Sequence, residues 1–179
     1  MGARLKDMVH YVVRHTAPEK LGATKLNKVL WFADVMHYRL HGRSISGSSA
    51  YQKNHFGPTP DGINEVIAEL KRDSSIAERR SMTPAGARRE YVWLADADAS
   101  AFTADEVDTI QQVIEWATPM TAKEISDLSH DALWEETELG CAISIAAASV
   151  SPSEPDEEDL AWARQSFEIA TTDAIRQTA

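Results

Sequence analysis

The sequence contains little cysteine and no long apolar run. Cys141 is the one thiol in 179 residues, which excludes a disulfide within the chain and a metal site built from several thiolates. No stretch approaches the eighteen or so uncharged apolar residues that would span a membrane. Lys6, Asp7 and Arg14 interrupt the region where a signal peptide would be apolar. These absences predict a cytoplasmic protein that makes no membrane contact.

Common catalytic motifs are missing as well. The chain has no G-x-S-x-G nucleophile elbow, no P-loop and no G-x-G-x-x-G turn. Cys141 lies in the apolar run 140–148 with no nearby cation to activate it, so a buried structural thiol is the expectation. We therefore expect a protein that binds a partner, with no enzymatic activity and no cofactor.

Composition and charge suit a folded domain with an acidic end. Hydrophobic residues make up 43% and charged residues 26% of the chain, and the net charge is −10. Residues 1–94 carry 15 Lys and Arg against 9 Asp and Glu, a net of +6, whereas residues 95–179 carry 3 against 19, a net of −16. The acidic half can serve solubility, fold over a basic face, or contact a basic partner.

Apolar spacing predicts a mainly α fold. One helix is expected over residues 3–15, and a second should begin after Thr24 as its N-cap and end at Gly42. Thr59 and Pro60 have the chemistry of an N-cap followed by proline at the first helical position, so a third helix is expected from there to about residue 72.

The next segments predict one small β-hairpin and two capped helices. Residues 76–82 and 88–94 flank a Thr-Pro-Ala-Gly turn, which is typical of a hairpin. Thr103 and Thr121 are each followed three residues later by glutamate, at Glu106 and Glu124, and this is the pattern of a capping box.

The domain organisation follows from where composition changes. Residues 1–148 are expected to form a single compact helical domain. Residues 149–159 are rich in Ser, Pro and acid and are expected to form a linker. Residues 160–179 place Leu160, Ala163 and Phe167 at helical spacing, so a C-terminal helix is predicted.

One group of side chains has the spacing of a metal site. His37 and His41 lie four residues apart on one predicted helix, with Asp34 a turn earlier. His37 falls in the apolar stripe, where a hydrogen-bonded core histidine is the commoner case, and His41 lies beside the end of the helix, where it suits the helix dipole. We therefore predict no metal site.

A winged-helix DNA-binding protein is the alternative. The helix that follows Thr59 and the hairpin after it have that order, and four hairpin arginines could contact phosphates: Arg79, Arg80, Arg88 and Arg89. However, Asp61, Glu65 and Glu69 form an acidic row on the outward face of the helix, which would meet the DNA. Nucleic acid is therefore the less favoured partner.

Several separated segments carry a family resemblance. The string TKLNKVLWFADVMHYRLHGRSISG, the later YQKNHFGPTPDGI and the still later SDLSHDALWEETELGCAIS occur in this order. They resemble the Panacea domain, a family of antitoxins similar to SocA and of phage-associated relatives. The matching residues are Lys25, Leu26, Lys28, Trp31, Phe32, Ala33, His37, Gly42, Phe56, Gly57, Pro58, Leu128, Ser129, His130 and Trp134. Thr59 stands where the family usually has valine, and the chain after residue 148 lies beyond the resemblance.

The resemblance implies an antitoxin that neutralises a cognate protein toxin encoded by an adjacent gene through direct contact. In the SocA type, the antitoxin also delivers its toxin to a ClpXP-like protease. Trp31 lies off the main apolar line of its helix, close to Lys25 and Lys28, so these three residues are expected to form an exposed partner-binding surface. The turn formed by His55, Phe56, Gly57 and Pro58 is expected to extend that surface.

Overall fold

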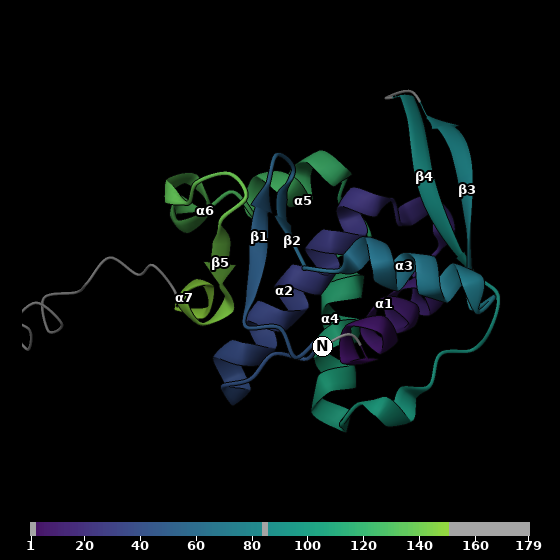
Figure 1. The fold of residues 1–179 in the computed structure, drawn as a ribbon, viewed down its shortest axis with the longest axis horizontal. Helices are drawn as coiled ribbons and strands as arrows, with labels where there is room; N and C mark the ends of the chain where they lie inside the picture. The colour runs from purple at the N-terminus through teal and green to yellow at the C-terminus, as the bar shows by residue number, and fades with distance from the viewer. Residues whose placement is uncertain (1–2, 84–85, 151–179) are drawn as a thin grey trace, which may run out of the picture.

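The computed structural model describes residues 3–83 and 86–150, a helix-rich fold with small antiparallel strands (Figure 1). The predicted mainly α character is confirmed. The helices are α1 (Ala3–His15), α2 (Ala23–His41), α3 (Ile63–Arg72), α4 (Ala104–Ala117), α5 (Ala122–Leu128), α6 (Ala132–Glu136) and α7 (Ile145–Ser149), with short 3-10 turns η1 (Pro18–Lys20) and η2 (Ala99–Ala101). The strands are β1 (Ala50–Asn54), β2 (Gly57–Thr59), β3 (Ile76–Thr83), β4 (Gly86–Trp93) and β5 (Ala142–Ser144).

Helix α2 is the centre of the fold. It packs against α1, α4, α5, α7 and β2, so side chains on most of its circumference are buried. The predicted end is confirmed, because the Gly42 N–H donates to the Tyr38 carbonyl oxygen at 2.8 Å. The predicted start is not. Gly22 occupies the N-cap position and Thr24 lies inside the first turn.

A three-stranded sheet with the order β2-β1-β5 lies beside α2. The sequence patterns predicted one β-hairpin and did not predict this sheet. Thr59 pairs with Gln52 in this sheet, and α3 begins at Ile63 after Gly62. The prediction that Thr59 caps α3 is therefore wrong. The three residues of β2, Gly57–Thr59, pair with β1, and strand β5 comes from almost ninety residues further along the chain, which local sequence patterns do not reveal.

The predicted hairpin is confirmed as β3 and β4, which pair from Ile76↔Trp93 to Thr83↔Gly86. The hairpin extends beyond the helical body (Figure 1). Tyr91 is buried on its inner side, whereas Trp93 is partly exposed and lies under the Arg14 guanidinium, whose carbon is 4.1 Å from the ring centroid. The two central turn residues, 84 and 85, lie outside the described residues.

Both predicted capping boxes are present. The Thr103 hydroxyl accepts from the Glu106 N–H, and the Glu106 carboxylate accepts from the Thr103 N–H at 2.9 Å. The buried Glu106 carboxylate also pairs with Arg4 at 2.7 Å and with Arg43 at 2.9 Å. One residue therefore both caps α4 and attaches it to α1 and to the segment after α2.

The predicted linker, residues 149–159, and the predicted C-terminal helix, residues 160–179, fall outside the described residues except for 149 and 150. Ser149 ends α7, and this helix packs on α2. Within residues 3–83 and 86–150, no helix combines the length and apolar character that crossing a bilayer requires.

Candidate protein-binding site

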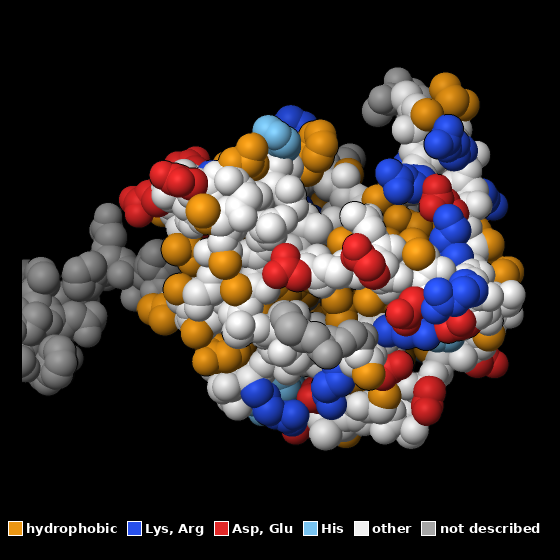
Figure 2. Space-filling view, viewed as in Figure 1, with side chains coloured by type: hydrophobic (Ala, Val, Ile, Leu, Met, Phe, Trp, Pro, Cys, Tyr) orange, Lys and Arg blue, Asp and Glu red, His pale blue; other side chains and the backbone are white. Residues whose placement is uncertain are grey.

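The turn between β1 and β2 presents an exposed aromatic side chain on a braced backbone. Phe56 is 72% exposed, and His55 beside it is also exposed. The Phe56 carbonyl oxygen accepts from Ser126 Oγ at 3.3 Å, and the Pro58 carbonyl oxygen accepts from Lys28 Nζ at 3.3 Å. Hydrophobic and histidine side chains are visible at this edge of the molecule in Figure 2. Two helices, α2 and α5, therefore hold the turn.

Gly57 makes this close approach possible. Its φ of 97° is a conformation that residues with a side chain rarely adopt. A Cβ atom at this position would overlap Lys28 Nζ and would lie 2.6 Å from Ser129 Oγ. The buried Gly57 and Pro58 shape the turn from below, so the contact surface that it offers consists of His55 and Phe56.

The prediction that Lys25, Lys28 and Trp31 form an exposed surface is wrong. Their exposed fractions are 5%, 1% and 3%. Trp31 packs against Tyr51, with ring centroids 5.2 Å apart. The β1–β2 turn and the segment between α4 and α5 cover this side of α2, and neither packing partner could be inferred from helical spacing.

Burial changes the chemistry of the two lysines. It lowers the pKa of Lys28 to about 7. The pKa of Lys25 is lowered first by burial and then by the charges of Lys20 and Arg88. Lys25 Nζ donates to the Thr118 carbonyl oxygen at 3.1 Å, so this lysine links α2 to the end of α4. Both lysines therefore make hydrogen bonds inside the protein.

The closing segment of the resemblance packs beside the same turn. The His130 ring stacks on Trp134 with centroids 3.7 Å apart, and Lys53 Nζ lies 4.0 Å from the centre of the Trp134 ring. Burial, and then the charge of Lys28, lower the pKa of His130. Ser129 Oγ donates to the Ser126 carbonyl oxygen at 2.8 Å. Three segments that are distant in sequence thus meet around one turn.

Two recesses open beside the first turn of α2, and we call them the lysine recesses. The larger holds about 630 Å³ and is bordered by charged residues that include Glu19, Lys20, Lys25, Arg88 and Arg89. The smaller holds about 270 Å³ and is lined by Ala23, Thr24, Asn27, Lys28, Asn54, Phe56, Thr59 and Arg89. They share Ala23, Thr24 and Arg89. Lys25 and Lys28, although buried, thus line recesses that open to solvent, and Phe56 borders one of them.

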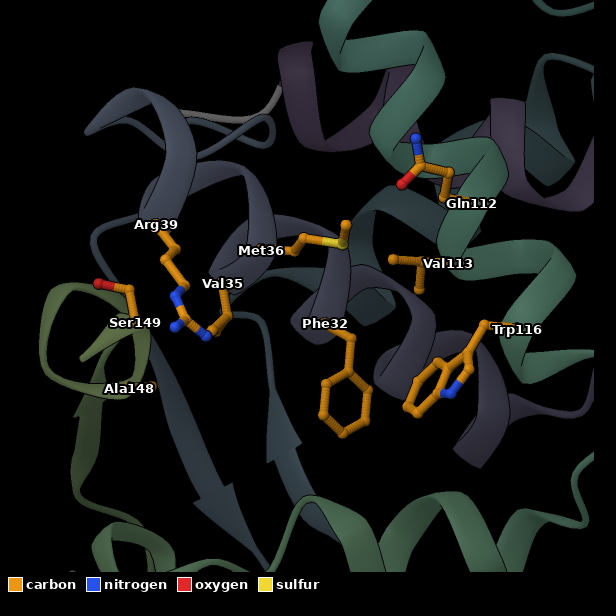
Figure 3. A pocket seen from close by; sticks show the side chains of 9 residues that line it. All are labelled: Phe32, Val35, Met36, Arg39, Gln112, Val113, Trp116, Ala148 and Ser149. Atoms are coloured by element: carbon orange, nitrogen blue, oxygen red, sulfur yellow. The ribbon is translucent and has the colours of Figure 1, made fainter. Parts of the chain in front are cut away.

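An apolar groove lies further along α2, between α4 and α7. It holds about 560 Å³ and is lined by Phe32, Val35, Met36, Arg39, Gln112, Val113, Trp116, Ala148 and Ser149. Figure 3 shows the Phe32 and Trp116 side chains on facing walls, and their rings meet edge to face with centroids 5.0 Å apart. The packing of α4 beside α2 brings these residues together at the groove.

The histidine pair belongs to the scaffold. His37 is fully buried, its Nδ1 lies 3.3 Å from Thr109 Oγ1, and its ring stacks on His41 at 4.3 Å. Asp34 is fully buried too, but it faces the loop after α2. In the part of the chain that the structure describes, no group of three or more His, Cys, Asp and Glu residues is placed to hold a metal ion.

Three of the four hairpin arginines, Arg79, Arg88 and Arg89, lie beside carboxylates. The buried Glu90 accepts from the Ser81 hydroxyl, from Arg88 and from Arg79 Nε at 2.7 Å, and these three donors lower its pKa to about 2. Arg89 lies 3.9 Å from Glu78. Figure 2 shows acidic and basic side chains interspersed along this side. With acidic residues also exposed on α3, these pairs weaken the case for phosphate contacts.

Cys141 is exposed, which corrects the prediction of a buried thiol. It follows the Gly140 turn at the start of the segment that leads into β5, while Ile143 and Ile145 of the same apolar run are buried. We expect the native protein to react with Ellman's reagent at a rate within about tenfold of the urea-unfolded chain, because exposure controls access to a thiol. A native thiol that reacts only after unfolding would contradict this placement.

Comparison with protein families agrees with the resemblance. The family model described as antitoxin SocA-like, Panacea domain, matches residues 26–135, which is more than half of the chain. The chain belongs to this SocA-like Panacea antitoxin family. Comparisons with curated proteins and with solved structures give no match. The family match spans α2 through most of α6, and therefore contains the β1–β2 turn, Lys28 and the His130–Trp134 stack.

Proposed function

We propose that this Panacea-domain protein is an antitoxin that neutralises a cognate protein toxin by binding it directly, without catalysis. The observation that carries the proposal is the braced β1–β2 turn. Lys28 of α2 and Ser126 of α5 hold this turn in place, and Phe56 projects from it into solvent. The described part of the chain offers a recognition surface here, since aromatic anchors on pre-ordered backbone contribute most to protein interfaces.

The scaffold supports recognition because little order has to be gained on binding. Gly57, Lys28 and Ser126 already fix the backbone from Phe56 to Pro58. A rigid anchor loses less conformational freedom when it is buried than a mobile loop would. The protein can thus mask a functional surface of a toxin with one edge of a small sheet.

The test is to express the chain together with the protein encoded beside it. We expect Phe56→Ala to weaken capture of that protein by at least about thirtyfold, as for a central aromatic anchor, and to abolish rescue of cells that express it. Met82→Ala is the matched control, because Met82 is 81% exposed but lies near the end of the β3–β4 hairpin.

Two results would contradict the proposal. The neighbouring protein could fail to bind the unaltered chain while remaining toxic in its presence. Alternatively, Phe56→Ala and Met82→Ala could rescue cells equally well, which would remove the β1–β2 turn from the interface. Affinity measured on purified proteins separates a change in binding from a change in expression.

A further inference from the structure

Lys25 and Lys28 are buried lysines, and neither forms a salt bridge with a carboxylate among residues 3–83 and 86–150, although the charge of Glu124 acts on Lys25. Each ammonium has three N–H donors, and the one hydrogen bond found for each goes to a backbone carbonyl oxygen, that of Thr118 or that of Pro58. Lysine is almost never buried to this extent unless its charge is paired. Here both side chains border a recess that is open to solvent.

The surroundings add positive potential to the lysine recesses. Lys20 and Arg89 line the larger recess, and Arg89 also lines the smaller one. The N-terminus of α2 points to the same place, and its N-cap, Gly22, supplies no side-chain acceptor. Unsatisfied N–H groups and the helix dipole favour an anion here. Glu19 is the acidic residue that borders the larger recess, and Arg88 is already paired with Glu90.

We infer that the lysine recesses accept carboxylate side chains of the captured toxin, with Lys25 and Lys28 as the ammonium groups that bind them. The identity of the occupant rests on the function proposed above. An acidic side chain that enters beside Phe56 would complete the hydrogen bonding of a buried ammonium, and a charge-assisted bond of this kind is stronger than one between neutral groups. Phe56 would then bury its ring at the rim of the same contact.

A dye-labelled hexaglutamate peptide tests the recesses without the toxin. We expect it to bind the full-length chain, with hexaglutamine of the same length as the uncharged comparison. Replacing both lysines, Lys25→Met with Lys28→Met, should weaken binding at least tenfold while keeping the buried aliphatic stems. Lys123→Met is the matched control, because Lys123 is exposed on α5 and pairs with Asp127. Its binding should equal that of the unaltered chain.

The pH dependence gives a second measurement on the unaltered protein. The charged groups near Lys28 are Arg89 on β4 and His130 after α5, while Lys20, Arg88 and Glu124 lie near Lys25. With a free pKa of about 7, Lys28 must take up a proton to bind a carboxylate at higher pH. Affinity for hexaglutamate should therefore fall between pH 7 and pH 9, by up to about tenfold per pH unit. His130 stays neutral over this range because its pKa is lowered.

Each outcome decides the inference. Equal binding by the double methionine variant, or affinity that is flat from pH 7 to pH 9, would overturn it. A full-length variant with amides at residues 154 and 156–159 tests the chain's own acidic segment. At least tenfold tighter hexaglutamate binding by this variant would show that the segment fills the recesses and that the toxin does not. Hexaglutamate binding could need both lysines while the chain captures no neighbouring protein. In that case the proposed function fails, although the recesses do bind carboxylates.

Discussion

Gly57→Ala is expected to destabilise the protein by about 3 kcal/mol or more and to abolish toxin capture with it. A side chain at a φ of 97° costs on the order of 1–3 kcal/mol in backbone strain. The added Cβ would also overlap Lys28 Nζ and crowd Ser129 Oγ. Either the turn moves outward or the buried lysine leaves the Pro58 carbonyl oxygen, and both changes displace Phe56.

Urea unfolding of purified protein measures this effect, and Gly140→Ala is its control. Gly140 also has a positive φ, 83°, but a Cβ atom there would meet nothing within 4 Å. The control should therefore show backbone strain alone, about 1 kcal/mol. Similar losses in the two variants would mean that the contact between the turn and Lys28 does not constrain position 57.

Asp34→Ala is expected to cost about 3–5 kcal/mol, because it removes one buried acceptor that serves four donors. The Asp34 carboxylate accepts from the Ile45 N–H at 2.8 Å, the Ser46 N–H at 2.9 Å, the Ser46 hydroxyl and the Tyr51 hydroxyl at 2.9 Å. It is fully buried. Through these bonds it holds the loop after α2 and the start of β1 against the helix.

Asp34→Asn distinguishes the loss of side-chain volume from the loss of hydrogen-bond acceptors. The amide keeps the volume and one acceptor oxygen but turns an NH₂ group toward donors, so an intermediate loss is expected. Asp127→Ala is the control, since this carboxylate is exposed and pairs with Lys123 on the same helix. It should leave the urea midpoint unchanged. If Asp34→Ala unfolds at the same midpoint as the control, the loop is held by other contacts.

Local patterns predicted the parts of the fold that depend on neighbouring residues. The two threonine boxes cap α4 and α5 because an N-cap hydroxyl and a glutamate three residues later need only each other. Helix α1 spans the predicted residues, since a continuous apolar face defines it. The hairpin was predictable too, because a short turn joins its two strands and the residues that pair are close in the sequence. Thr59 is the counterexample, because strand pairing with Gln52 overrides its preference for a cap.

The candidate site was partly predictable. The separated segments that resemble the Panacea domain indicated the family, and the family match over residues 26–135 confirms it. They also indicated the turn that contains Phe56. The exposure of Lys25, Lys28 and Trp31 was predicted wrongly, because helical periodicity orders residues around one axis and does not show which other segments cover each side.

The sequence by itself determined the helix-rich class, the two capping boxes, the hairpin and the family. Each of these depends on residue type and short-range spacing. The tertiary structure alone decided that Lys28 lies under Gly57, that His130 and Trp134 stack beside Lys53, and that the two buried lysines border open recesses. Those contacts join residues that are roughly 30 to 90 positions apart. Burial, and with it the lowered pKa of Lys28, is a property of the assembled core and not of the residue.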